Sequence, residues 1–478
     1  MPKLNELDAW LGERLPELLA EHQVPAASIA VYAHGEVIDR AAGVLNKNTG
    51  VEATADSVFQ IGSITKVWTA TLVMQLVDEG ALDLDAPVRT YVTEFVLADE
   101  KAAAEITVRQ LLCHVGGFEG DIFTDTGRGE DAVGKLVPLL ADMPQLFAPG
   151  EMFSYNNAAF CVLGRLVEVL RGKPYDECLG EYLIKPLGLT HTAPSPYEAV
   201  MHRAAMGHLS SPAGDGPRPA PYWATPRSNA PAGSMLAMQS RDLLTFARMH
   251  IDGGLGPDGT RVLSAESALA MRRREVEVPD LGYIGSAWGL GWALYDWPGG
   301  AVVGHDGNTV GQSAFLRVVP EQDVAVALLT NGGDPIPLFT ELAGRVLHEL
   351  AGIEMPARPT PGAEAAGVQT VGAGTTAAGQ PATEASRFVG TYASSVYDTV
   401  VSQDTDGRLW VERIPKGVLA TTVSGPPEKI ELVAYDGDTL ITAEPVQGMF
   451  LPHAFIGDDG EGRALFVHTG RADRRVER

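Results

Sequence analysis

Ser63 and Lys66 are the residues whose types and spacing most directly suggest chemistry in this chain. They follow Gly62 and lie at the start of a predicted helix over residues 65–80, in which apolar side chains recur at helical spacing. Residues i and i+3 of a helix share a face, so the Lys66 amine comes within hydrogen-bond reach of the Ser63 hydroxyl. A serine needs a base beside it, and a lysine serves as that base when burial or nearby positive charge lowers its pKa. The pair predicts a nucleophile with its base.

Two further patterns support this prediction, because a four-residue pattern with two fixed positions also arises by chance. Tyr155-Asn-Asn157 precedes a predicted helix over residues 157–171, and His305-Asp-Gly307 opens a predicted turn between two strands. Taken singly, the first is typical of a helix cap and the second of a turn. Together with the Ser63 motif they are specific for serine acyl transfer.

With these motifs the chain resembles the serine β-lactamase and penicillin-binding-protein superfamily, closest to class C β-lactamases, D,D-peptidases of the same group and related esterases. The likeness covers about residues 5–350 and includes H-x-G in place of the family's K-T-G. It implies that Ser63 attacks a carbonyl while Lys66 and Tyr155 share the acid–base work, through a depressed lysine pKa or a tyrosinate stabilised by the lysine. It also implies an oxyanion hole made by the backbone N–H groups of Ser63 and Asn308, and an Asn157 side chain that binds the substrate amide.

The third motif departs from the family pattern at two positions. His305 stands where the family has lysine, and a neutral imidazole holds a substrate carboxylate less well than an ammonium does, which disfavours β-lactamase activity. Asp306 stands where much of the superfamily has threonine. We predict Asp306 and Gly307 among the substrate-binding residues, with Asp306 holding the ammonium of an incoming peptide N-terminus. The alternative is an Asp-Gly turn, and strand alternation would point Asp306 away from His305.

A narrower resemblance is to the penicillin-binding-protein-type thioesterases, the stand-alone cyclases of nonribosomal peptides. It rests on the H-x-G motif, a predicted lipocalin-like barrel at the C-terminus and the absence of a signal peptide pattern. It implies that the serine takes a peptidyl thioester from a carrier protein and that the peptide's own N-terminal amine releases it as a macrolactam. A cytoplasmic esterase or D-aminopeptidase would use the same residues. A non-catalytic binding protein built on the fold is a third alternative.

Composition narrows the possible partners. The chain of 478 residues has room for two or three domains, and its 45% hydrophobic content is typical of a globular protein. A net charge of −25 disfavours nucleic acid and anionic membranes. Acidic residues near the start, where a signal peptide would be basic, lead us to expect a cytoplasmic protein. An acidic carrier protein would need a local basic surface, for which Arg272–Arg274 is a candidate, although such clusters are usually solvated faces.

No metal or cofactor is predicted. The three cysteines, Cys113, Cys161 and Cys178, are odd in number and lack the spacing of metal ligands, so we interpret them as small buried apolar residues. The chain also lacks the G-x-S-x-G pattern of α/β-hydrolases and the H-E-x-x-H pattern of zinc peptidases. Rival hydrolytic chemistries therefore have no motif here.

The motifs are positioned by helices and strands whose predicted order indicates an α+β domain over residues 1–352. A helix over residues 4–21 and a hairpin over 27–42 precede the Ser63 helix, and residues 81–275 are mostly helical, with Ser240 as a candidate cap. Four strand-like runs then follow, at residues 290–295, 301–304, 312–319 and 323–330. A helix is predicted after them, over residues 338–350. This order predicts an antiparallel sheet built from both ends of the domain and flanked by helices.

A second domain is predicted after a linker. Residues 353–386 are rich in Pro, Gly, Ala and Thr, which is typical of a flexible linker. Residues 387–478 contain short alternating segments separated by tight turns, which favours a small antiparallel β-barrel. The linker is long enough for the barrel to lie near the active-site mouth. We expect its deletion to change substrate selection more than the hydrolysis of simple esters.

Overall fold

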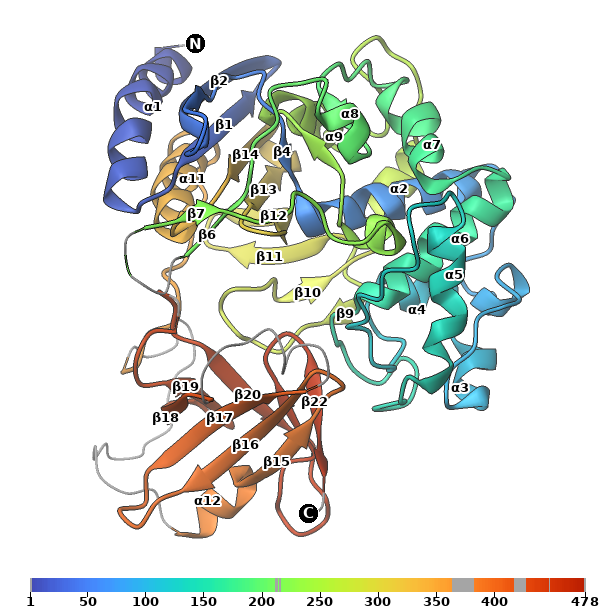
Figure 1. Cartoon of the computed structure of the whole chain (residues 1–478), viewed down its shortest axis with the longest axis vertical. Helices are drawn as coiled ribbons and strands as arrows, with labels where there is room; N and C mark the ends of the chain where they lie inside the picture. Colours follow the sequence, from blue (N-terminus) through green and yellow to red (C-terminus); the bar gives the residue numbers. More distant parts are fainter. Residues whose placement is uncertain are drawn as a thin grey trace.

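The computed structural model describes residues 2–210, 214, 216–362, 382–416, 427–446 and 448–476. Its main body is an antiparallel sheet covered by helices on both faces (Figure 1). The sheet runs in the spatial order β3 (Val51–Glu52), β2 (Glu36–Asn46), β1 (Ala26–Ala33), β14 (Val324–Thr330), β13 (Ser313–Val319), β12 (Gly300–Asn308), β11 (Ala293–Trp297), β10 (Ala287–Trp288) and β9 (Val276–Glu277).

The two ends of the domain meet in the middle of this sheet. Strand β1 pairs with β14 from Ala27 opposite Thr330 to Ala33 opposite Val324. All of β1 is buried, because helices cover both of its faces. The prediction of an antiparallel sheet made from both ends of the domain is therefore confirmed.

Strand alternation divides the core into two layers. Ile29 and Val31 of β1 pack toward α1 (Pro2–Glu21) and α11 (Pro335–Ala351). Ala30 and Tyr32 face the other core, which contains α2 (Thr65–Asp78) and α9 (Ser240–Ile251). Figure 1 shows α1 and α11 on one side of the strands and α2 on the other. The Ser63–Lys66 motif lies in the α2 layer, whereas Tyr155 packs against the other core.

A helical region extends from the α2 side. Its longest member, α6 (Asn157–Arg171), starts where the side chain of Asn156 accepts from the Ala159 N–H and ends at Gly172, whose φ of 65° suits a left-handed cap. The remaining helices of this region are α3 (Glu100–Glu105), α4 (Val108–Leu112), α5 (Ala132–Leu136), α7 (Tyr175–Leu179), α8 (Pro196–Ala199) and α10 (Ala265–Ala270). Short strands outside the main sheet form two small sheets, one of β4 (Phe59–Gln60), β8 (Ala237–Met238) and β5 (Thr192–Ala193) and one of β6 (His208–Leu209) and β7 (Arg218–Pro219).

The C-terminal part is a closed antiparallel barrel beside the sheet (Figure 1). Its strands are β15 (Gly390–Ala393), β16 (Tyr397–Gln403), β17 (Leu409–Pro415), β18 (Lys429–Asp436), β19 (Thr439–Thr442), β20 (Pro452–Ile456), β21 (Phe466–His468) and β22 (Ala472–Val476). Strand β15 pairs with β22, which removes both free edges. The predicted fold class, an α+β catalytic fold followed by a small barrel, is confirmed.

Two local predictions are wrong. Ser240 is not a helix cap: it lies inside α9, whose cap position is Gln239, and its hydroxyl is 2.8 Å from that of Ser28. The segment predicted as linker includes the start of α12 (Ala382–Phe388), whose Ala385 and Phe388 pack into the barrel core. Residues 363–381 of that segment lie outside the described residues.

Within the described part of the chain, no helix is both long enough and apolar enough to cross a membrane.

Candidate active site

Ser63 lies in a single helical turn, η1 (Gly62–Ile64), that leads directly into α2. Helix α2 is buried around its whole circumference, and its Trp68 stacks on Phe246 of α9 with ring centroids 4.1 Å apart. A helix that is apolar on all sides belongs in the centre of a domain. The core therefore fixes the direction in which the first turn of this helix presents Ser63.

The Lys66 amine lies 3.1 Å from Ser63 Oγ and donates to the carbonyl oxygen of Ala232 at 2.6 Å. The side chain is fully buried. Burial lowers the pKa of Lys66 to about 7, and the positive charge of Arg471 acts in the same direction. An amine with this pKa is largely neutral just above pH 7, so it can accept the Ser63 proton.

Tyr155 approaches the same pair from the loop before α6. Its ring stacks on His114 with centroids 4.4 Å apart, and the Lys66 amine is 4.9 Å from its centroid. Burial raises the pKa of Tyr155, an effect that the neighbouring Ser63 hydroxyl offsets in part. The opposite pKa shifts of Tyr155 and Lys66 favour a neutral phenol beside a neutral amine over a tyrosinate beside an ammonium.

His305 is buried on β12 and faces the α2 layer. Its Nδ1 is 2.7 Å from the backbone carbonyl oxygen of Asp306, which can only accept, so Nδ1 carries the hydrogen. Burial lowers the pKa of His305 to about 4, with the charge of Lys66 a smaller cause. The imidazole is therefore neutral, and its Nε2 has no hydrogen-bond partner among the described residues. It presents an acceptor to the site.

The Asp-Gly turn alternative is wrong, because Asp306 and Gly307 belong to β12. As alternation requires, the Asp306 side chain lies on the opposite face from His305. Its two oxygens accept from the buried Arg317 at 2.6 and 3.1 Å. Arg317 itself lies over the ring of Phe339 in α11. The amine-binding role predicted for Asp306 therefore competes with an existing ion pair.

Two glycines bring η1 and β12 into backbone contact. A Cβ on Gly62, whose φ is 51°, would lie 2.5 Å from the nitrogen of Asn308, and one on Gly307 would lie 2.8 Å from the nitrogen of Ser63. The first N–H groups of a helix have no acceptor within it. The amides of Ser63 and Asn308 thus lie close together, as an oxyanion hole requires.

Among the described residues, the end of β12 has no strand paired with it on the β11 side, so its edge is open there. Strand β11 pairs with β12 only as far as Ala293 opposite Gly304. Residues 305–308 continue beyond that pairing, beside Ser63. An extended peptide can add to such an edge through main-chain hydrogen bonds.

Asn157 is the first residue of α6, while its neighbour Asn156 is the cap. The Asn157 amide donates to Asp121 at 2.8 Å. The other oxygen of Asp121 is 2.6 Å from Nε of Arg471, which comes from the turn between β21 and β22 of the barrel. The Arg471 guanidinium also lies 5.1 Å from the centroid of the Tyr155 ring. The barrel thus contributes a charged side chain to the site.

Three of these residues, His114, Asp121 and Arg471, were not predicted. His114 has a positive φ of 59°, and its Nδ1 accepts from the N–H of Asn156, which positions the Tyr155 loop. The residues around it, Leu111-Leu-Cys-His-Val-Gly-Gly-Phe118, assign the histidine no task. Asp121 and Arg471 belong to no motif.

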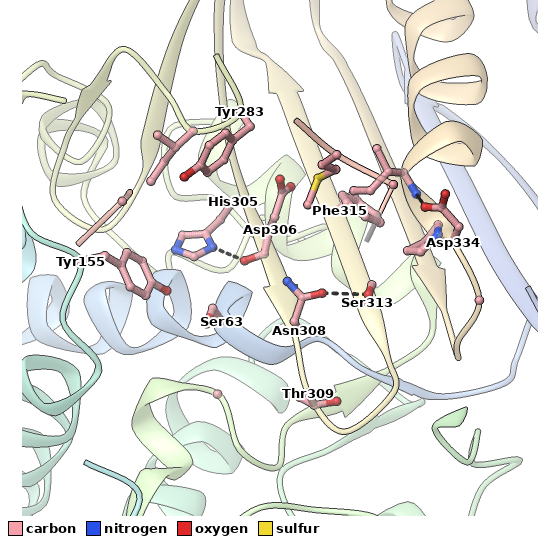
Figure 2. Close-up of a pocket in the computed structure, with 18 of the residues that line it drawn as sticks. Ser63, Tyr155, Tyr283, His305, Asp306, Asn308, Thr309, Ser313, Phe315 and Asp334 are labelled. Carbon is pink, nitrogen blue, oxygen red and sulfur yellow. Dashed lines mark hydrogen bonds between the residues drawn. The ribbon is translucent and has the colours of Figure 1, made fainter. Parts of the chain in front are cut away.

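Most of the predicted residues line one pocket of about 1490 Å³: Ser63, Tyr155, Asn157, His305, Asp306 and Asn308. Lys66 does not line it but contacts Ser63. Ser63, Tyr155 and His305 gather at one end of the view in Figure 2, and Phe315 and Asp334 lie farther along the pocket. The barrel supplies part of the wall through residues 448–449 and 469–471. The structure therefore brings the motifs together and confirms that the barrel lies at the active-site mouth.

The fold and this site define a serine enzyme of the β-lactamase fold. The chain belongs to the β-lactamase family, whose model, described as Beta-lactamase, matches residues 11–351. Penicillin-binding protein 4 of Amycolatopsis lactamdurans is 47% identical over 354 residues, 74% of this chain and 92% of that protein. A crystal structure of SurE has a TM-score of 0.77 and 29% identity, over 99% of this chain and 100% of that one. D-amino acid amidase from Ochrobactrum anthropi SV3 has a TM-score of 0.60 and 25% identity, over 72% of this chain and 98% of that one.

Proposed function

We propose that the protein is a serine acyltransferase that takes a peptidyl thioester onto Ser63 and releases it as a head-to-tail macrolactam. The observation that carries this proposal is the size of the pocket at Ser63, about 1490 Å³, walled by both the sheet domain and the barrel. Pockets for drug-sized ligands are typically about 300–1,000 Å³. This one leaves room for a peptide that folds back onto its own carbonyl. The match to SurE extends over 99% of this chain, so it includes the barrel as well as the sheet domain.

Acylation uses the neutral amine of Lys66. As Ser63 Oγ attacks the thioester carbonyl, its proton moves to Lys66 Nζ, 3.1 Å away. The backbone N–H groups of Ser63 and Asn308 stabilise the oxyanion, each donor being worth roughly 2.7–4 kcal/mol in comparable sites. The carbon–sulfur bond then breaks, and the thiolate takes a proton from the Lys66 ammonium or through the Tyr155 hydroxyl. The product is a peptidyl ester of Ser63.

Release reverses these roles. The N-terminal amine of the bound peptide attacks the ester carbonyl and passes a proton to the neutral Lys66 amine. The carbon–oxygen bond breaks, Ser63 Oγ regains a proton by way of Lys66, and the new amide closes the ring. An amine held next to the ester competes with water because its effective molarity is high. The His305 Nε2 acceptor and the open edge of β12 are positioned to hold the peptide backbone during this step.

The partner in this proposal is a carrier protein that presents the thioester, and the reaction belongs in the cytoplasm, where carrier-bound peptides are assembled. The predicted docking cluster is weaker than its sequence indicates. Arg274 is paired with Glu277 and Asp296, and Arg272 is partly buried with its Nε donating to Ala268. Arg273 remains exposed. With the charge of the exposed Arg274 already paired, the cluster provides little attraction for an acidic carrier, so the docking surface has to lie elsewhere or be apolar.

The test is product analysis with a peptidyl thioester of a short model carrier arm. We expect mass spectrometry to show a Ser63 adduct in a single turnover, followed by a cyclic product 18 Da lighter than the linear acid, the mass of one water. Ser63→Ala should form neither. An adduct that yields only linear acid would contradict cyclisation while keeping the acyltransferase chemistry.

A D-aminopeptidase or esterase is the second candidate, favoured by the similarity to D-amino acid amidase. It needs only a small donor and water. Turnover of D-amino amides or simple esters at rates above those of peptidyl thioesters would establish it in place of the cyclase.

A further inference from the structure

The pocket has a second side, and an arginine on it has no task in the reaction proposed above. Arg358 follows α11 on the segment that leaves the sheet domain, and it lines the pocket together with Met449 of the barrel. Its Nη1 lies 3.2 Å from the sulfur of Met449. A thioether is a weak acceptor, so this contact leaves the guanidinium with unused donors.

Other arginines near the pocket are paired. Arg317 is paired with Asp306 and Arg471 with Asp121. Arg358 has no carboxylate within ion-pair distance among the described residues. Its pKa is lowered, because burial outweighs the attraction of more distant carboxylates such as Asp306. An unpaired charge that is partly buried is costly, and an incoming anion that supplies the missing partner offsets that cost.

The open edge of β12 connects this side of the pocket to the nucleophile. An extended peptide on residues 305–308 would point successive side chains to opposite faces of the sheet. One set would face the His305 side with Ser63. The other set of peptide side chains would face the side of Asp306 and Phe315, where Arg358 lies. The pocket thus offers a cation to one face of a bound chain.

We propose that Arg358 forms a subsite for a negatively charged group carried by the acyl donor. The group is a carboxylate side chain of the peptide or the phosphodiester of a phosphopantetheine arm, since a guanidinium contacts both with paired N–H donors. This inference rests on the proposed function, because it takes the donor to be a peptidyl thioester. Met449 and Phe315 would line the apolar part of the same subsite.

Two matched pairs of donors test the subsite with the full-length protein. The first pair consists of two pantetheine thioesters of one peptide, which carry Glu or Gln at the same position. The position of this residue in the peptide is varied from one pair to the next. The second is the neutral peptide on pantetheine or on 4′-phosphopantetheine. We expect the wild type to prefer the anionic member of one pair in kcat/KM. Arg358→Gln should reduce that preference about tenfold, the scale of a charge-assisted hydrogen bond, and Arg358→Lys should keep part of it.

Arg408→Gln is the matched control, because Arg408 is an exposed barrel arginine paired with Asp404 and Asp406. It should keep the wild-type preference. Loss confined to the Glu pair identifies a carboxylate, and loss confined to the second pair identifies the phosphate group of the arm. No preference in the wild type, or an equal preference in Arg358→Gln, overturns the subsite.

Failure of the proposed function gives a different result, namely no Ser63 adduct with any thioester. Calorimetry of phosphopantetheine and of the free Glu peptides then tests the subsite directly. Weaker binding to Arg358→Gln than to the wild type and Arg408→Gln supports it, and equal binding overturns it.

Discussion

At the scale of single residues, the proposed mechanism predicts that Lys66 sets the pH dependence of acylation. Lys66 has to be neutral to take the Ser63 proton, and burial lowers its pKa to about 7. The acylation rate should therefore rise with pH up to about 7 and level off above it. Neither Tyr155, whose pKa is raised, nor His305, with a pKa of about 4, adds a change between pH 5 and 9.

Rapid-quench measurement of the acyl-enzyme across this pH range checks the assignment. Lys66→Ala should lower the rate by roughly 10²–10⁴ and abolish the rise near pH 7. A rise that persists in Lys66→Ala would assign the titration to another group.

The ion pair between Asp306 and Arg317 favours a structural role for Asp306 over the binding of a peptide amine. Asp306→Asn leaves Arg317 buried without a carboxylate, so we expect the free energy of unfolding to fall by about 2–4 kcal/mol. The ratio of cyclic to linear product should stay unchanged. A lower cyclic fraction at unchanged stability in thermal melts would instead support the amine-binding role.

The residues of the three motifs were predictable, and most of their partners were not. Ser63 and Lys66 are neighbours on one helix turn, so their contact follows from local geometry. Arg317 meets Asp306 across two strands whose pairing and register depend on the whole sheet. A sequence pattern fixes the first kind of contact and leaves the second open.

At the scale of elements, the close approach of η1 and β12 makes Gly62 necessary. Gly62→Ala would place a methyl group 2.5 Å from the Asn308 nitrogen and displace a donor of the oxyanion hole. We expect kcat to fall about 10²-fold or more. Gly80 is the matched control: its φ is also positive, at 70°, but a Cβ there meets nothing within 4 Å.

Gly80→Ala should cost about 1–2 kcal/mol of stability from backbone strain and leave kcat near the wild-type value. Steady-state kinetics with thermal melts compares the two variants. Equal losses of kcat in both would show that strain in α2, rather than the contact with β12, limits catalysis.

Elements with strong local signals were predicted almost to the residue. Helix α6 has the predicted bounds, because its apolar periodicity is bounded by a cap and by Gly172. The end of β12 was misjudged, since Asp-Gly favours a turn and only pairing with β13 keeps residues 305–308 extended. Ser240 has the character of a cap, but the buried hydroxyl of Ser28 binds it. In both cases tertiary contacts outweigh local preference.

At the scale of the whole molecule, the barrel positions the Tyr155 loop. The N–H of Tyr155 donates to the carbonyl oxygen of Gly470, and Nε2 of His468 lies 2.8 Å from the carbonyl oxygen of Phe153. These contacts join residues more than 300 positions apart, which no sequence pattern indicated. Deleting the barrel should therefore lower ester hydrolysis and cyclisation together, in place of the selective effect expected from the sequence.

Arg471 offers a more precise test than deletion. Its charge lowers the pKa of Lys66, so Arg471→Gln should move the rise of the acylation rate to higher pH. The rate at neutral pH should fall severalfold. Arg471→Lys keeps the charge and should keep the wild-type pH profile, even though it weakens the contact with Asp121. An unmoved profile in Arg471→Gln would show that the barrel acts on Tyr155 through its backbone contacts alone.

The pairing of β1 with β14 has a consequence for biosynthesis. Ala27 cannot meet Thr330 until about 300 further residues have been made, which takes about 15–60 s at ribosomal speeds of roughly 5–20 residues per second. During that interval the apolar β1 strand is exposed, as is usual where contacts are distant in sequence. The nucleophile is translated early, yet its oxyanion donor Asn308 and the support for Tyr155 at Gly470 come much later. A nascent chain thus carries Ser63 in an unassembled site, and we expect acylation of Ser63 to begin only once the barrel has been synthesised and docked.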